Sequence, residues 1–232
     1  MKRRGSSSMS STNRKCVLLS VAVIVAALGP APASWACYSG LVLIPTADVT
    51  GPYIWALDLQ WQGYSRALRT DQLIINTEFG FGERLELGVD VDATSGSVEN
   101  RALFNAKYVF VSSDAHRFAM AAGVQNVGQR FTPVFYLVAT KDWGVLRTHA
   151  GVQHDEDGGR NELFMGVDRS LGERWQIMAD YTAGDQNAAS AGVSWMGGGW
   201  QVLLGAQWPN AGGPPVAVVH VIFTGAFRRG RG

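Results

Sequence analysis

The sequence predicts an all-β protein, an antiparallel up-and-down transmembrane β-barrel of about twelve strands. Three observations predict this fold. Segments of about 8 to 10 residues alternate apolar and polar side chains, as strands with two different faces do. Shorter and longer connections alternate between the segments, which is typical of transmembrane barrels. Glycine is abundant, at 28 of 232 residues, and long stretches rich in Ala, Leu, Glu and Lys are missing.

Residues 1–36 predict an export signal. A basic, Ser-rich start precedes an apolar run, 17–28, that is too short for a membrane helix of about 20 residues. Ser34 and Ala36 put small residues at the two positions that a signal peptidase reads, so we expect cleavage after Ala36. The alternative is an uncleaved transmembrane anchor, and the length of the run counts against it.

Cleavage there makes Cys37 the first residue of the mature chain and removes Cys16, so no intrachain disulfide can form. A Cys at this position raises bacterial lipidation as an alternative. The Leu usually found three positions before a lipidated Cys is missing, and we expect an unmodified thiol. Residues 37–53 contain Pro45 and Gly51-Pro52, which interrupt any strand, and predict an N-terminal segment packed into or under the barrel.

The charge balance argues against nucleic acid as a partner. The whole chain has a formal charge of +1, with 20 basic and 19 acidic residues. Five of the basic residues lie in the first 36 positions, which leaves 15 basic against 19 acidic residues in the mature part. A mildly acidic protein has no electrostatic attraction for phosphates. The Arg-rich tail at 228–232 is expected to be a solvated end.

The hairpin 73–92 sets the phase of the predicted strands. Its second arm, 85–92, places Leu and Val on one face and Glu, Gly and Asp on the other. The connection at 80–83 is short, as an antiparallel hairpin requires. The same Gly-Glu-Arg triplet occurs at 82–84 and 172–174, in each case at a short turn before a strand. Counting outward from this hairpin predicts a barrel over 54–227.

The other expected strands repeat the pattern in order. They are 54–61, the two arms of the hairpin, 101–110, 118–125, 133–140, 145–153, 161–169, 174–182, 188–195, 200–208 and 216–224. Segment 133–140 is apolar on both faces, so its orientation stays open. Short connections at 80–83, 112–116, 141–144, 170–173 and 196–199 alternate with longer ones, of which 62–70 is an example. With an even strand count, both ends of the barrel lie on the short-turn side.

The two faces of these strands differ in chemistry. The apolar face carries aromatic side chains near strand ends, which suit the headgroup level of a membrane. We expect these membrane-interface aromatics to be Trp55, Trp61, Tyr108, Trp175, Tyr181, Trp195, Trp200 and Trp208. The opposite face carries charges, expected to line the lumen as one network: Asp58, Glu78, Glu86, Asp90, Lys107, Arg147, His149, Asp168 and Asp180.

Glycines recur near the middle of six strands on the charged face, at positions 88, 123, 151, 166, 192 and 205. We interpret them as kinks that let the sheet close. The alternative fold is a soluble secreted β-sandwich that binds a ligand, with a solvated charged face. A solvated face gives no reason for such regular glycines, and the barrel is favoured.

The predicted lumen is expected to be a structural network without enzymatic activity. Buried charges need partners, and Lys107 and Arg147 could pair with Glu86, Asp90 and Asp168. The four His are scattered, so no metal site and no cofactor is expected. If the lumen is open, its excess of acids favours cations or neutral solutes over anions.

The enzymatic alternative is a barrel-embedded lipid or glycan hydrolase. It would need a nucleophile, a base and an orienting acid close together. The candidates are Ser190 or Ser194, then His149 or His154, then Asp168 or Asp180.

The segments GLVLIPTADV (40–49), Leu57-Asp58-Leu59 and GFGERLELGVD (80–90) resemble the YjbH-like outer-membrane β-barrel proteins. Chains of that family begin with a similar Gly-Leu-x-x-x-Pro-Thr/Ser-Ala segment after the leader. The likeness covers about 50 residues, within 40–91. It implies contact with outer-membrane lipid and an association with exopolysaccharide production or export. The expected function is therefore an envelope-structural role or the passage of a small or glycan solute.

Overall fold

The alternating strands close into a barrel. The computed structural model describes residues 40–64, 69–94, 102–128, 132–156 and 159–227, all within one compact unit, Ala31–Gly232. The predicted signal peptide, Cys37 and the Arg-rich tail lie outside the described residues. No helix in the described part of the chain is long and apolar enough to cross a membrane.

Twelve antiparallel strands of 8 to 13 residues form the barrel wall. They are β1 (Ile54–Tyr64), β2 (Arg69–Phe81), β3 (Leu85–Asp92), β4 (Ala102–Ser113), β5 (Phe118–Val127), β6 (Val134–Asp142), β7 (Arg147–Asp155), β8 (Arg160–Leu171), β9 (Trp175–Thr182), β10 (Ala188–Gly197), β11 (Trp200–Pro209) and β12 (Val216–Ala226). Each strand pairs with its neighbours in sequence, and β1 also pairs with β12. The predicted fold class, a closed antiparallel barrel of twelve strands, is confirmed.

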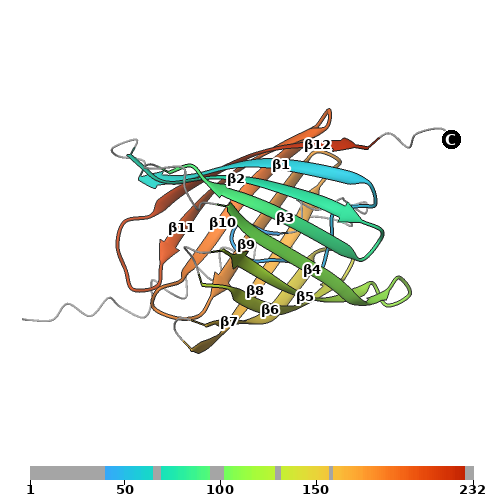
Figure 1. Cartoon of the computed structure of the whole chain (residues 1–232), viewed down its shortest axis with the longest axis horizontal. Helices are drawn as coiled ribbons and strands as arrows, with labels where there is room; N and C mark the ends of the chain where they lie inside the picture. Colours follow the sequence, from blue (N-terminus) through green and yellow to red (C-terminus); the bar gives the residue numbers. More distant parts are fainter. Residues whose placement is uncertain (1–39, 65–68, 95–101, 129–131, 157–158, 228–232) are drawn as a thin grey trace, which may run out of the picture. The chain divides into compact units, whose positions relative to one another are not determined.

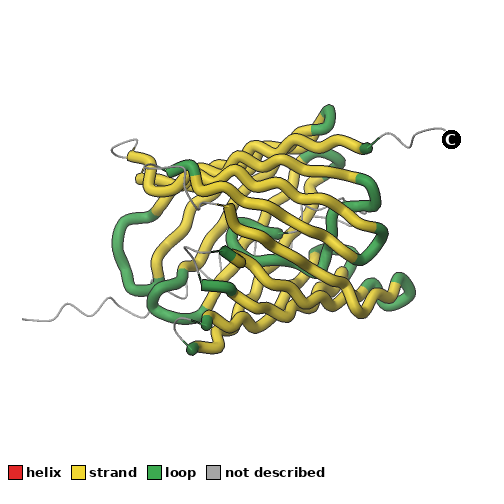
Figure 2. Tube along the Cα trace, viewed as in Figure 1, coloured by secondary structure: helices red, strands yellow, loops and turns green. Residues whose placement is uncertain are grey.

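The first and last strands join along ten residue pairs, from Ile54 opposite Ala226 to Gly63 opposite Ala217. This pairing removes the exposed sheet edges that an open sheet would leave. The start of β1 and the end of β12 lie at the same rim as the short turns, on the right in Figure 1. The longer connections lie at the opposite rim (Figure 2).

The repeated Gly-Glu-Arg triplet has a conformational cause. Gly82 has φ +70° and Gly172 has φ +71°, in the left-handed region that glycine tolerates without a steric penalty. Each glycine opens the short turn before its strand, β3 or β9. The recurrence therefore marks equivalent turns at one rim.

Several strands extend beyond their predicted ends. The polar stretch 62–70, predicted as a loop, contributes its first three residues to β1 and its last two to β2. Backbone pairing continues there because the hydrogen-bond ladder does not depend on alternating side chains. β7 begins at Arg147, later than the predicted 145, because the Trp143 N–H donates to the Leu146 carbonyl at 2.9 Å and closes a turn.

The hydrophobic core lies inside the barrel. Tyr136, Val138 and Thr140 are 8%, 0% and 5% exposed, which fixes the orientation of β6 that its sequence left open. Many alternate apolar side chains on the strands are instead exposed, Leu163, Met165 and Leu204 among them. The wall is thus apolar outside, while its interior holds a mixture of apolar and charged groups.

Candidate functional site in the barrel interior

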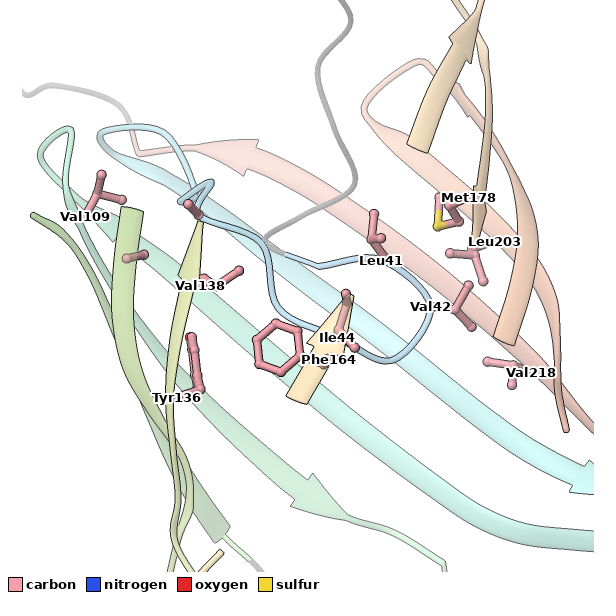
Figure 3. Close-up of a cluster of buried hydrophobic side chains, with 12 residues drawn as sticks. Leu41, Val42, Ile44, Val109, Tyr136, Val138, Phe164, Met178, Leu203 and Val218 are labelled. Carbon is pink, nitrogen blue, oxygen red and sulfur yellow. The ribbon is translucent and has the colours of Figure 1, made fainter. Parts of the chain in front are cut away.

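The N-terminal segment, described from Gly40 to Tyr53, packs against the inner wall of the barrel. Its first turn is closed by the Leu41 N–H, which donates to the Ile44 carbonyl at 2.9 Å, and by a bridge between Gly40 and Pro45. Figure 3 shows Leu41 and Val42 directed toward Met178, Leu203 and Val218, with Ile44 beside Phe164. These side chains belong to one buried apolar cluster that also includes residues of β4, β5 and β6.

Wall side chains bind the backbone of this segment near its start. The N–H groups of Val42 and Leu43 both donate to Asp180 Oδ2, at 2.9 and 3.1 Å. The Ala47 N–H donates to Thr140 Oγ1 at 2.9 Å. A buried backbone segment outside a sheet needs such partners, because an unpaired N–H is costly away from water.

The end of the segment is held by Glu86 on β3. The Thr50 N–H and hydroxyl donate to Glu86 Oε2 at 2.6 and 2.7 Å. The backbone carbonyls of Thr50 and Gly51 lie so close to Gly80 that any side chain at Gly80 would overlap them. The chain is therefore fixed both at mid-barrel and at the short-turn rim.

Inward glycines make room for the segment. A Cβ placed on Gly166 would lie 2.5 Å from Leu41 Cδ1. Cβ atoms on Gly192 and Gly205 would lie 3.1 and 3.3 Å from the methyl groups of Val42. These three glycines therefore leave room for apolar side chains of the segment, and their interpretation as kinks for closure stays a prediction.

The other inward glycines serve wall residues. A side chain at Gly123 would overlap the Tyr136 ring, and one at Gly151 would overlap Phe164. Close packing in an interior leaves no space for both groups. Gly88 has looser surroundings, with Asn105 Cβ at 3.3 Å, and it lies on the wall of a cavity.

An ion pair connects the segment to β7. Arg147 donates to Asp48, and its Nε lies 3.8 Å from Asp168 Oδ1. Burial of Asp48 acts to raise the pKa of its carboxyl, but the charge of Arg147 and the hydrogen bond from it outweigh this. The pKa of Asp48 therefore lies below its ordinary value of 3.8.

A chain of hydrogen bonds continues from this ion pair through His149. Its Nε2 lies 2.6 Å from Asp168 Oδ1, and its Nδ1 lies 2.9 Å from Thr140 Oγ1. Gln176 donates to the other Asp168 oxygen at 2.8 Å. Thr140 also accepts a hydrogen bond from the Ala47 N–H. This network therefore connects Asp168 and His149 of the barrel wall to the N-terminal segment.

The predicted hydrolase centre is assembled only in part among the described residues: His149 binds Asp168, as the base and the orienting acid would, but the two predicted serines have other partners. Ser190 donates to Asp180, and Ser194 accepts a hydrogen bond from Gln201 at 2.7 Å. His149 instead contacts the Thr140 hydroxyl, as described above. His154 lies on the other face of β7, as its separation of five residues predicts, and contacts Asn161.

The predicted lumen residues fall into two groups. Asp58, Glu78, Glu86, Asp90 and Lys107 line one cavity of about 350 Å³. Within this group the Lys107 ammonium lies 3.2 Å from Glu86, and both side chains are at least nine-tenths buried. The carboxylate of Asp90 does not meet a cation there but accepts a hydrogen bond from Asn105.

The second group, Arg147, His149, Asp168 and Asp180, consists of the residues that hold the N-terminal segment or support those that do. Sequence reasoning did not single out several residues that bind members of these two groups. These are Asp48, Thr50, Thr140 and His220, the last of which binds Asp58. Thr140 lies on the strand whose orientation the pattern left open, and the first two precede the strands, so no periodicity marks them.

The predicted aromatics lie near the two rims. Those toward the short-turn rim are Trp55, Tyr108, Trp175, Trp195 and Trp200, and those toward the opposite rim are Trp61, Tyr181 and Trp208. Trp195 and Trp200 pack edge to face across the β10–β11 hairpin, with ring centroids 5.2 Å apart. Tyr108, Trp208 and Trp175 are the most exposed of the set, at 50%, 49% and 48%. Tyr181 and Trp200 are also more than 40% exposed, so five of the eight side chains are only partly covered by protein.

A second hollow of about 370 Å³ opens at the short-turn rim. It is lined by Asp48, Arg117, Asp142, Arg147 and Asp168, among others. Its lining contains two ion pairs, Arg117 with Asp142 and Arg147 with Asp48. Among the residues that the structure describes, no group of three or more His, Cys, Asp or Glu side chains could hold a metal ion.

Comparison with known proteins gives a likeness in fold. Neither a family model nor a curated protein matches the sequence. The structure of the KdgM porin superposes with a TM-score of 0.53, at 12% sequence identity over 75% of this chain and 99% of that one. A structure of the KdgM porin in complex with disordered oligogalacturonate gives 0.51, at 13% identity and the same coverage. A triple mutant of the Rhodopseudomonas blastica porin gives 0.42, at 15% identity over 67% of this chain and 56% of that one.

At these identities the likeness shows a porin-like barrel architecture. The finer resemblance to YjbH-like proteins stays a prediction.

Proposed function

We propose that this chain is an outer-membrane β-barrel through which a small hydrophilic solute passes, restricted by the N-terminal segment. The observation that carries the proposal is a polar cavity of about 350 Å³ inside a closed barrel with an apolar outer face. A closed barrel satisfies every backbone group along its wall, as lipid requires. The KdgM porin likeness supports the same architecture.

The outer face supports a lipid environment. Large apolar side chains are exposed along the middle of the strands, including Leu163, Met165 and Leu204 at 66%, 58% and 53%. A soluble protein would rarely leave so continuous an apolar surface in water. The two aromatic sets at the rims match the girdles of membrane barrels. With the predicted export signal, this supports an outer-membrane location with the short turns facing the periplasm.

The cavity supports a neutral or cationic solute. Its charged lining comprises four carboxylates, Asp58, Glu78, Glu86 and Asp90, against one ammonium group, that of Lys107. Such a lining repels anions. The oligogalacturonate in the KdgM complex is a polyanion, so this cavity does not favour the same ligand. A neutral glycan unit or a small cation is the better match.

One observation favours an envelope-structural role as the second candidate. The N-terminal segment is held by backbone hydrogen bonds to Asp180, Thr140 and Glu86, and by the ion pair of Asp48 with Arg147. Contacts this numerous would also suit a permanently closed barrel. The two candidates differ in whether loosening the segment produces a pore.

Conductance in planar bilayers tests the proposal. The variant Leu41→Gly/Val42→Gly/Ile44→Gly removes the apolar contacts of the segment but keeps its length. We expect single-channel conductance several-fold above that of the wild type. The control is Ala211→Gly/Pro214→Gly/Pro215→Gly, which makes equivalent changes in a connection outside the barrel wall and should leave conductance unchanged.

Heat-modifiable gel migration establishes that each variant is folded. If the folded wild type and the folded segment variant are both silent, passage is contradicted and the structural role is supported. If the control also gains conductance, the effect does not come from the segment.

A further inference from the structure

A row of polar side chains crosses three adjacent strands on the cavity wall. The register places Asp58 on β1 opposite Asn76 on β2, and Asn76 opposite Asp90 on β3. All three residues line the cavity of about 350 Å³. Adjacent strands lie about 4.8 Å apart. The carboxylates of Asp58 and Asp90 are therefore two strand spacings apart, with the Asn76 side-chain amide between them.

His220 on β12 extends this row. Its Nδ1 lies 2.9 Å from Asp58 Oδ2, which also accepts a hydrogen bond from Gln60 at 2.9 Å. An ionised carboxylate can only accept hydrogen bonds, so we assign a proton to Nδ1 of the His220 ring. In the neutral form of an imidazole with Nδ1 protonated, the other nitrogen, Nε2, is an acceptor.

Three polar atoms in this row lack hydrogen-bond partners. Within the described residues, Asp58 Oδ1, Asp90 Oδ1 and His220 Nε2 are buried and make no hydrogen bond. The three residues are only 9%, 9% and 8% exposed, and each lines the cavity. A buried acceptor without a donor costs free energy. A ligand with several hydrogen-bond donors would satisfy these atoms.

The charge of the row specifies a cation. The Lys107 ammonium, which lines the same cavity, lies 3.2 Å from Glu86, and one ammonium group cannot balance the four carboxylates of that lining. A metal ion is a poor match, because no cluster of three metal-ligating side chains exists in the described structure. The wide spacing with an amide in the centre suits an extended organic ion with more than one N–H group.

We propose that Asp58, Asn76, Asp90 and His220 form a binding site for a small organic ammonium ion of the aliphatic diamine class. The ammonium groups donate to the Asp58 and Asp90 carboxylates, and His220 Nε2 accepts a further N–H. This inference rests on the proposed function, since it names the solute class of the same cavity.

Isothermal titration of the folded mature chain in detergent micelles tests the site. The probe is putrescine, and butane-1,4-diol is its uncharged analogue of similar length. We expect putrescine to bind and the diol to give no heat of binding. Asp58→Asn and Asp90→Asn should each weaken putrescine binding at least about 10-fold, because charge-assisted hydrogen bonds are lost.

Glu173→Gln is the matched control, because it removes one carboxylate from an exposed turn outside the cavity. It should leave putrescine binding unchanged. Equal weakening by Glu173→Gln would indicate general charge attraction and would overturn the site. If Asp58→Asn does not fold, Asn76→Leu provides an uncharged test, since it should also weaken binding.

The two proposals fail separately. Conductance in bilayers without putrescine binding overturns the site and leaves passage intact. Putrescine binding that depends on Asp58 and Asp90, in a barrel that never conducts, keeps the site and contradicts passage. Binding of putrescine and the diol with equal affinity overturns the assignment of a cation.

Discussion

Arg147 on β7 donates a hydrogen bond to Asp48 of the N-terminal segment, a residue 99 positions earlier in the chain. The same guanidinium lies 3.8 Å from Asp168, which in turn binds His149. One cation therefore joins the segment to the inner wall near the short-turn rim. A contact of this kind makes docking of the segment sensitive to charge.

Docking of the N-terminal segment should weaken in acid. Because the pKa of Asp48 in the folded protein lies below 3.8, ionised Asp48 contributes stability that is fully present above pH 3.8. That contribution is lost as the pH falls through the lowered pKa. Hydrogen exchange of the amides at 41–50 should therefore accelerate below about pH 4, measured against amides in β10 and β11.

The variant Asp48→Asn isolates this effect from the neighbouring ionisable groups Asp142, His149 and Asp168. In Asp48→Asn the amides should exchange faster already at neutral pH, and the additional acid-induced acceleration should shrink. An unchanged acid response in Asp48→Asn would assign the pH dependence to the other groups.

Removing the cation from the buried pair Lys107–Glu86 should be strongly destabilising. Lys107→Met leaves the Glu86 carboxylate buried without its ammonium partner, a loss on the order of 3–5 kcal/mol. The double variant Lys107→Met/Glu86→Gln should recover part of this loss. Urea unfolding in detergent measures it, and Arg84→Met, at an exposed turn, should change the midpoint little.

A methyl group on the glycine wall should push against the N-terminal segment. Gly166→Ala places a Cβ 2.5 Å from Leu41 Cδ1 and 2.7 Å from Ile44 Cδ1, and should cost about 1–3 kcal/mol. Gly88→Ala, whose nearest contact is 3.3 Å, should cost less. The temperature at which half of the protein loses its folded gel mobility measures the stability of both variants. Equal losses of stability would show that contact with the segment is not the cause.

An arginine on the outer face should be costly only in the middle of a strand. Met165→Arg, at the centre of β8, should destabilise the barrel in lipid by about 2–4 kcal/mol. Asn161→Arg, four residues away on the same face near the rim, should cost about 0–1 kcal/mol. Folding efficiency into lipid vesicles measures the difference. Its absence would favour the soluble alternative.

The barrel was predictable because its signals are local. Alternation along strands such as β3 and β9 is a property of neighbouring residues, and it identified which side chains face inward. The short turns marked by Gly82 and Gly172 then fixed the strand order, since antiparallel neighbours in sequence pair directly. Strand ends were predicted less well, because pairing of backbone groups at 62–64 continues where the side-chain pattern stops.

Contacts between distant segments left no such signal. The sequence by itself determined the number and order of the strands, the faces of most of them and the excess of acids on the inner face. Only the tertiary structure decided which wall residues hold Gly40–Tyr53, that Gly166 makes room for Leu41, and that His220 meets Asp58 162 residues away. Barrel closure brings these groups together through the pairing of β1 with β12, and one sequence has no periodicity that encodes such a meeting.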